Sequence, residues 1–171
     1  MAVDIPFRRQ LDFDYGTADV VGPGIRRVIA ENPSPFTLYG TGTYILGSGS
    51  VAVVDPGPAD EAHIAALLRA TEGETISHIL VTHTHMDHFV GLPFFAPAYN
   101  PTNKVSFWSG HLRPDRTLRE ACEHLMSNPL FPVPPDVFQA EVSFNDFDCG
   151  ETLQPFGDVR LVTAPLDHPG R

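Results

Sequence analysis

The stretch His83-Thr-His85-Met-Asp87-His88 brings three imidazoles and one carboxylate together within six residues. Zinc prefers such ligands, and a catalytic zinc site keeps one position open for water. Because His83 and His85 are two residues apart, extended backbone puts both rings on one side, where they can reach one ion. Asp87 and His88 follow where the chain turns toward a helix, and they can point to a second ion nearby, as in two-metal hydrolases. The spacing predicts a hydrolytic metal centre, the alternative being a surface histidine run without a role.

The chemistry expected of this centre is metal-assisted hydrolysis. Zinc lowers the pKa of a bound water to about 7, so zinc-bound hydroxide is available at neutral pH. Asp87 can hold that water and accept its proton, which makes it the candidate catalytic residue. No Ser or Cys stands in an obvious triad setting. Zinc is the expected cofactor, and manganese or iron remain alternatives.

A strand and a helix are expected to position the cluster. Residues 76–82 (ISHILVT) form a nearly continuous apolar run, typical of a strand buried on both faces, and the cluster begins at its carboxyl end. Upstream, residues 36–46 and 51–55 have a hairpin pattern around the turn 47–50. Asp60 is a helix cap and Gly73 a stop signal. This order predicts an α/β layered fold with the site at the carboxyl ends of strands.

The remaining elements are assigned by periodicity and proline content. Strands are expected at 104–108, 140–144 and 159–163, and a helix over 114–127 with Pro114 at its first position. Cys122 lies on the apolar stripe of that helix, which indicates core packing. Residues 128–136 hold four prolines and predict an irregular loop, whereas residues 1–35 are expected to be a leader that packs across the rest. A length of 171 residues predicts one domain, 1–171.

Charge and hydropathy exclude several classes of partner. The chain has 11 basic and 21 acidic residues, and Arg26-Arg27 is its nearest approach to the basic cluster that nucleic-acid binding needs. A long duplex is therefore not expected, although metal ions could supply the charge for a short phosphodiester. No apolar run reaches the length of a membrane span. The amino terminus shows no apolar signal segment, which favours a cytoplasmic location.

The cluster matches the HxHxDH motif of the metallo-β-lactamase superfamily, and the resemblance covers about Ile25 to Gly170. It implies an αββα sandwich. In that family the first histidine pair binds one metal and the Asp-His pair binds the other. By resemblance, His83 and His85 take the first role, and Asp87 and His88 take the second.

Two further residues enter through the same resemblance. Asp55, in Val53-Val-Asp55-Pro-Gly57, resembles the family's strand-ending aspartate and is a candidate for orienting a ligand or water from behind the site. Its alternative is a simple turn-capping aspartate. His168, in Leu166-Asp-His168-Pro-Gly, resembles the third ligand motif, which completes the histidine triad of the first metal.

The length of the chain departs from the family pattern. Family members carry a bridging Asp and a final His after the third ligand, whereas three residues follow His168. We therefore expect only the front part of the sandwich, with its C-terminal portion lacking, one firmly bound zinc and a second position that is weak or empty. A sheet uncovered in this way would expose an edge and an apolar face, which predicts either a homodimer or poor solubility.

The substrate expectation rests on which branch each half resembles. Up to His85 the chain resembles lactamase-like hydrolases that include some ribonucleases. From Asp87 onward it resembles the phosphodiesterase and ribonuclease Z branch. Because the second half surrounds the site, phosphodiester hydrolysis is favoured. The alternatives are an amide, lactone or thioester hydrolase of the lactamase or glyoxalase II type, or a catalytically inactive metal-binding domain.

The other histidines receive no role from the sequence. They lie in a helix, at a strand start, in a loop and in a second helix, and each is expected to be solvated or locally hydrogen-bonded: His63, His78, His111 and His124.

Overall fold

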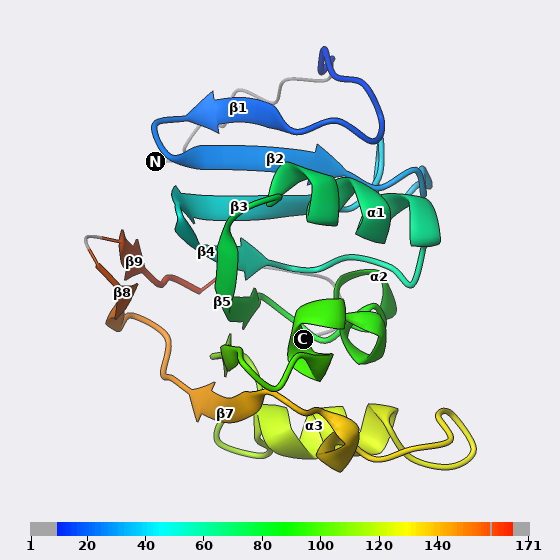
Figure 1. Cartoon of the computed structure of the whole chain (residues 1–171), viewed down its shortest axis with the longest axis vertical. Helices are drawn as coiled ribbons and strands as arrows, with labels where there is room; N and C mark the ends of the chain where they lie inside the picture. The colour runs from blue at the N-terminus through cyan, green and yellow to red at the C-terminus, as the bar shows by residue number, and fades with distance from the viewer. Residues whose placement is uncertain (1–9, 158, 166–171) are drawn as a thin grey trace, which may run out of the picture.

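The computed structural model describes residues 10–157 and 159–165 of the chain. Seven strands form one sheet in the order β1-β2-β3-β4-β5-β6-β7, stacked along the long axis of the molecule (Figure 1). The strands are β1 (Asp19–Gly22), β2 (Ile25–Ile29), β3 (Gly42–Ser48), β4 (Ser50–Val54), β5 (Thr75–Val81), β6 (Lys104–Ser109) and β7 (Glu141–Asp146). Sequence order and spatial order therefore coincide.

The sheet changes character at β4. Strands β1 to β4 pair antiparallel, whereas β4 to β7 pair parallel. Parallel neighbours need crossover segments, and each crossover here carries helical structure: α1 (Glu61–Ala70); α2 (Met86–Phe89) with η1 (Leu92–Phe94) and η2 (Ala96–Tyr99); and α3 (Leu118–Leu125) with η3 (Pro135–Val137). The carboxyl ends of β4, β5 and β6 consequently meet at one edge.

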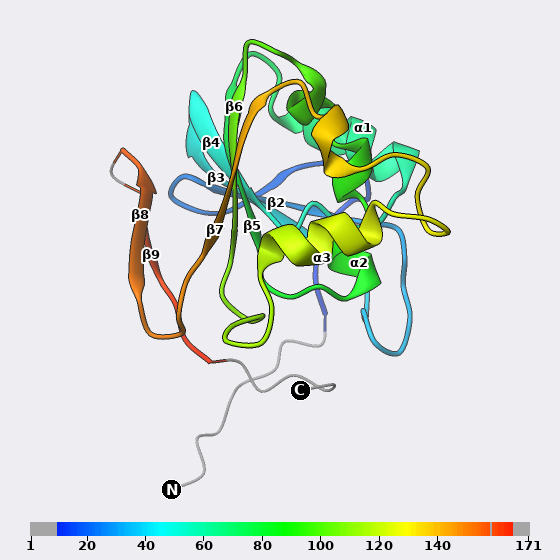
Figure 2. The ribbon, with the colours of Figure 1, turned by 90° about the horizontal axis from the view of Figure 1, so that it is seen from below.

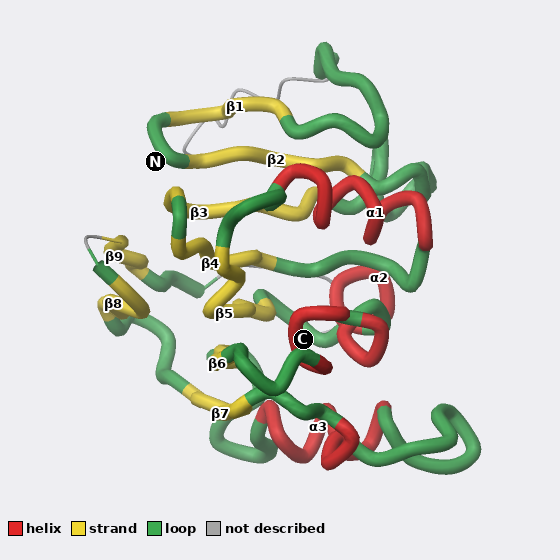
Figure 3. Tube along the Cα trace, in the orientation of Figure 1, coloured by secondary structure: helices red, strands yellow, loops and turns green. Residues whose placement is uncertain are grey.

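The molecule is layered. Helices α1, α2 and α3 cover one face of the sheet, and the hairpin of β8 (Thr152–Phe156) and β9 (Val159–Val162) stands on the opposite side (Figure 2). Figure 3 shows the same arrangement by element type. None of the described helices is long and apolar enough to cross a bilayer. The α/β fold class expected from the sequence is confirmed.

The core lies between the sheet and its helices. Alternate side chains of the central strands point into it and are fully buried, among them Val51, Val53, Ile79 and Phe107. Cys122 of α3 is also fully buried, as its position on the apolar stripe predicted.

The opposite face of the sheet is mixed rather than apolar. One cross-strand row pairs Ala52, His78, Ser106 and Ser143, and the His78 ring stacks on Phe156 of β8 at 4.9 Å. The expected homodimer through an apolar face stays a prediction. The burial on both faces expected for residues 76–82 holds at Ile76 and at residues 79–81. It is wrong at Ser77 and His78, which are partly exposed, and at Thr82, which is exposed.

The structure corrects the sequence in four places. The expected leader contains β1 and β2; β1 pairs with β2, and β2 pairs with β3 and carries the fully buried Val28. The strand expected from residue 36 begins at Gly42, because residues 34–40 fold into a turn in which Thr37 N and Leu38 N donate to Ser34 O. The C-terminal hairpin contains β8, which the sequence did not indicate.

The fourth correction concerns the helix expected over 114–127. Helix α3 begins at Leu118 because Thr117 and Glu120 form a capping box, in which each side chain accepts a hydrogen bond from the other's backbone N–H. Pro114 therefore lies outside the helix. By contrast, α1 is capped by Asp60 as expected, with the carboxylate accepting from Ala62 N at 2.8 Å.

Candidate metal centre

The histidine cluster lies where β5 ends. The strand stops at Val81, residues 82–85 continue in irregular backbone, and α2 begins at Met86 with His85 at its N-cap. The rings come together: the centroids of His83 and His85 are 4.7 Å apart, and those of His83 and His88 are 4.0 Å apart. The fold thus places the His83 ring beside the rings of His85 and His88.

Asp87 joins this group through a single carboxylate oxygen. Its Oδ2 lies 3.2 Å from Nε2 of His88 and accepts a hydrogen bond of 3.1 Å from the hydroxyl of Thr41. On its other side, Nδ1 of His88 lies 3.1 Å from Oδ2 of Asp55. The His88 imidazole is therefore held between two carboxylates.

These carboxylates control the charge of His88. Burial on its own would lower the pKa of the imidazolium, but the carboxylates of Asp55 and Asp87 outweigh burial and raise the pKa above 6.5. The two carboxylates therefore favour the protonated form of the His88 ring.

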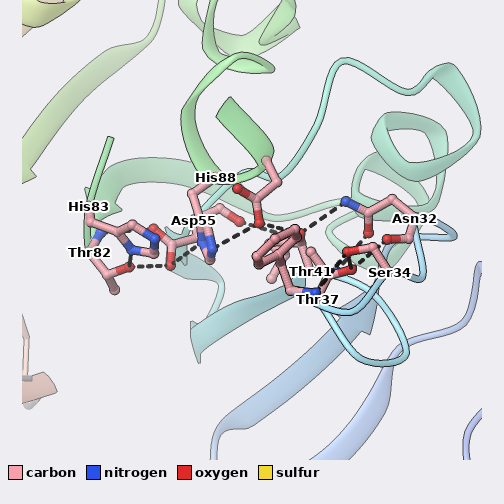
Figure 4. A network of polar contacts seen from close by, with 11 residues as sticks. Asn32, Ser34, Thr37, Thr41, Asp55, Thr82, His83 and His88 are labelled. Atoms are coloured by element: carbon pink, nitrogen blue, oxygen red, sulfur yellow. Dashed lines mark hydrogen bonds and ion pairs between the residues drawn. The ribbon is translucent and has the colours of Figure 1, made fainter. Parts of the chain in front are cut away.

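Asp55 also links the cluster to the sheet through Thr82. The carboxylate accepts from Thr82 N at 2.8 Å through Oδ1 and from the Thr82 hydroxyl at 2.6 Å through Oδ2. The same hydroxyl oxygen lies 3.0 Å from Nδ1 of His83. Figure 4 shows this run of contacts from Asp55 to His83.

The proton count along this run assigns the tautomer of His83. A hydroxyl has one hydrogen, and that of Thr82 is used toward Asp55. Its oxygen must therefore accept from His83, so Nδ1 carries the proton and Nε2 carries the lone pair. A metal-binding histidine is commonly held this way, with its second nitrogen donating to an oxygen behind the site.

Asp55 is placed by backbone geometry as well as by its side chain. It follows β4, is 5% exposed and has φ of +51°, which is uncommon for a residue with a Cβ. Its N–H donates to Leu80 O at 2.8 Å. The turn at Asp55 therefore directs the carboxylate toward Thr82 and His88.

His111 has a partner in the cluster that sequence spacing did not indicate. Its Nε2 accepts from Thr84 N at 3.1 Å, and its Nδ1 lies 2.8 Å from the hydroxyl of Ser109. Because β5 and β6 are parallel, with Val81 opposite Ser109, the residues after each strand emerge side by side. His111 thus braces the peptide between His83 and His85. Sequence analysis could have found it only as a histidine following the next parallel strand.

The other histidines have structural surroundings. The buried ring of His63 lies with Nε2 2.9 Å from the Thr43 hydroxyl, and burial lowers its pKa. His78 packs on the open sheet face against Phe156, and His124 is exposed on α3. None of these three lies in the cluster described above.

The donor set fits zinc in kind, because imidazole nitrogens and a carboxylate are its usual protein ligands. Within residues 10–157 and 159–165, no group of three or more His, Cys, Asp or Glu side chains already surrounds one point as an ion would require. His168, the predicted third ligand of the first metal, lies outside the described residues. The His83 tautomer and the paired contacts of Asp87 are the features that favour a cation here.

Sequence comparison with known proteins matches the segment that contains the cluster. Residues 37–106 match the family described as the metallo-beta-lactamase superfamily. The chain is 40% identical over 76 residues to an atrochrysone carboxyl ACP thioesterase, dmxR1, of Cryptosporiopsis sp., a match that covers 43% of this chain and 24% of that protein. It is 39% identical over 72 residues to the beta-lactamase-like protein 2 homolog of Caenorhabditis elegans, covering 40% and 24%.

Among solved structures, a metallo-beta-lactamase from Cronobacter sakazakii with a mutated HARLDQ motif aligns at a TM-score of 0.54 and 18% identity. That alignment covers 86% of this chain and 53% of the other, so the chain spans about half of that protein and the matches above span about a quarter of the curated relatives. At this identity the likeness concerns the fold. The segment 37–106, which contains the histidine cluster, is therefore similar to the metallo-beta-lactamase superfamily.

Proposed function

We propose that this chain is the metal-binding part of a metal-dependent hydrolase. The observation that carries the proposal is the convergence of His83, His85, Asp87 and His88 at the carboxyl end of β5, with His83 held in the tautomer that presents Nε2. Asp55 and Thr82, which hold that tautomer, touch the cluster from the sheet side.

The residues divide into two ligand sets. His83 and His85 would hold one zinc ion together with His168, which enters by family resemblance alone, and Asp87 and His88 would face a second position. Zinc bound there would supply a water of pKa near 7 and polarise the bond to be cleaved. Asp87 would hold that water and accept its proton.

Thioesters are the substrate class that we favour. The similar fungal proteins from Cryptosporiopsis and from Aspergillus fumigatus are named as acyl carrier protein thioesterases. The groups described above as contacting the cluster, from Thr41, Asp55, Thr82 and His111, are hydroxyls, a carboxylate and an imidazole. A neutral thioester carbonyl needs no cationic surface for binding, whereas a phosphodiester does. This choice replaces the phosphodiester favoured by the sequence.

Phosphodiester hydrolysis is the second candidate. The observation in its favour is the resemblance of residues 87–99 to the phosphodiesterase and ribonuclease Z branch. Bound metal ions would then have to supply all the positive charge that meets the phosphate.

The test is turnover of three substrates by the purified chain with defined zinc content: an S-acyl N-acetylcysteamine, bis-p-nitrophenyl phosphate and a lactam. We expect thioester cleavage that stops on chelation and in His83→Ala but continues in the matched control His124→Ala, whose side chain is exposed on α3. Cleavage of the phosphodiester alone would reverse the order of the two candidates. If zinc neither binds nor changes any rate, the hydrolase proposal is wrong.

A further inference from the structure

We infer that Thr41, held in place by Asn32, is a positioning residue for the Asp87 carboxylate. The inference rests on the proposed function, since it assigns the loop 30–41 to the orientation of a metal-site side chain. Asp87 lies 46 residues further along the chain, and its side chain is 32% exposed. A short carboxylate in that setting can rotate unless another group holds it.

The contact between the two segments follows from the sheet order. Strand β2 is antiparallel to β3, which is antiparallel to β4, so β2 and β4 run in the same direction. The loop from β2 to β3 therefore lies at the edge of the sheet from which β4 and β5 send Asp55 and the histidine cluster. Figure 4 shows the contacts continuing from Asn32 through Thr41 toward His88.

Thr41 is itself immobilised by Asn32. The carboxamide oxygen of Asn32 accepts from Thr41 N at 2.8 Å, and its amide nitrogen donates to Thr41 Oγ1 at 3.1 Å. Thr41 O also accepts from Ala30 N at 2.9 Å. Thr41 is 3% exposed. The Thr41 backbone is thus held by Asn32 Oδ1 and Ala30 N, and its hydroxyl oxygen by Asn32 Nδ2.

The rest of the loop is built to bring Asn32 and Thr41 together. The hydroxyl of Thr37 donates to Asn32 O at 2.6 Å and contacts the Ser34 hydroxyl at 2.8 Å. Gly40 has φ of +135°, and a Cβ there would lie 1.9 Å from Ala30 O. Only glycine fits this close approach. The close approach of Gly40 to Ala30 therefore helps to hold the loop in the conformation that positions the Thr41 hydroxyl.

The number of hydrogens on each group shows which atom donates in the hydrogen bonds from Asn32 to Thr41 and from Thr41 to Asp87. Asn32 Nδ2 is a donor, so the Thr41 oxygen accepts from it and the single Thr41 hydrogen is given to Asp87 Oδ2. Among the described residues, both polar contacts of the Asp87 carboxylate use Oδ2. Oδ1 is consequently the oxygen presented to a cation or water, and the Thr41 hydroxyl holds Oδ2 together with His88 Nε2.

The experiment compares Thr41→Val, which keeps the shape and removes the hydroxyl, with Thr41→Ser, which restores it. Thr71→Val is the matched control, because Thr71 is also buried and its hydroxyl donates only to carbonyls at the end of α1. Zinc affinity is measured by competition with a chromophoric chelator, and kcat and KM are measured on the thioester. Crystal structures of the zinc-free proteins give the rotamer of Asp87.

We expect Thr41→Val to bind zinc roughly 10–100-fold more weakly, the range typical of groups that orient a ligand from behind. We also expect kcat to fall with little change in KM, the Asp87 carboxylate to rotate in the zinc-free crystal, and Thr41→Ser to recover most of each loss. Unchanged zinc affinity together with an unchanged Asp87 rotamer in Thr41→Val would overturn the inference. A wild-type chain that binds no zinc would instead contradict the proposed function, and the rotamer comparison would still decide the role of Thr41.

Discussion

Replacing Asp55 with asparagine tests the link between the sheet and the metal centre. The side chain keeps its size, and asparagine tolerates the left-handed backbone that Asp55 adopts at φ of +51°. What changes is the set of hydrogen bonds. The carboxylate accepts from Thr82 N and the Thr82 hydroxyl and lies 3.1 Å from His88 Nδ1. An amide has one accepting oxygen, so its NH2 must face at least one group that now donates.

The structure allows the size of the effect to be worked out. Asp55 is 5% exposed, so the polar atoms of its own side chain have little access to water. A hydrogen bond to a charged group contributes about 1.5–3 kcal/mol, and an unsatisfied buried donor costs about 1–3 kcal/mol. We therefore expect Asp55→Asn to lower the free energy of unfolding of the metal-free chain by roughly 2–3 kcal/mol. Because the Thr82 hydroxyl also fixes the His83 tautomer, zinc affinity should fall roughly 10–100-fold.

Urea unfolding with chelator present measures the first quantity, and competition with a chromophoric chelator measures the second. Asp60→Asn is the control, since Asp60 caps α1 with one hydrogen bond and asparagine is an equally good N-cap. A change in unfolding free energy below about 0.5 kcal/mol, the range of ordinary surface substitutions, together with wild-type zinc affinity, would refute the role given to Asp55.

Three further predictions concern residues outside the ligand set. Burial lowers the pKa of His63 below 6.5, so the folded chain keeps this ring neutral while the unfolded chain takes up a proton. The contribution of His63 to the free energy of unfolding should therefore be fully present above pH 6.5 and be lost as the pH drops toward the folded pKa. Urea unfolding should show a smaller loss of this free energy at low pH in His63→Gln, whose amide can still donate to Thr43. An equal loss in the wild-type chain and in His63→Gln would count against this explanation. His111→Ala removes the acceptor of the Thr84 N–H, which lies between the two cluster histidines, and should lower the free energy of unfolding in urea by about 1–2 kcal/mol. His111→Gln has an accepting oxygen and should recover part of this loss. No recovery would argue against the bracing role of His111. Cys149 is exposed, whereas Cys122 is buried and burial raises its thiol pKa to about 12. A mild alkylating reagent should therefore add one adduct to the native chain, and mass spectrometry should locate it on Cys149. Labelling of Cys122 without unfolding would contradict its core position.

Much of the fold was accessible from local patterns. The cap at Asp60, the apolar run that became β5 and the apolar stripe containing Cys122 are properties of neighbouring residues, and each appears in the structure. Two local signals predicted different starts for α3, and the helix begins after Thr117, whose capping box satisfies backbone N–H groups, rather than at Pro114. The strands within 1–35 were missed because their partner, β3, lies elsewhere in the sequence.

In the candidate site, the metal-binding side chains could be predicted from the sequence, whereas the groups that hold them could not. Its donors are local, because His83, His85, Asp87 and His88 lie within six residues and their spacing alone predicts a shared cation. Which groups hold those donors depends on strand order. Thr41 arrives from the loop after β2, Asp55 from the end of β4 and His111 from the end of β6. No periodicity connects these positions; they meet because parallel strands release their carboxyl ends at one edge of the sheet.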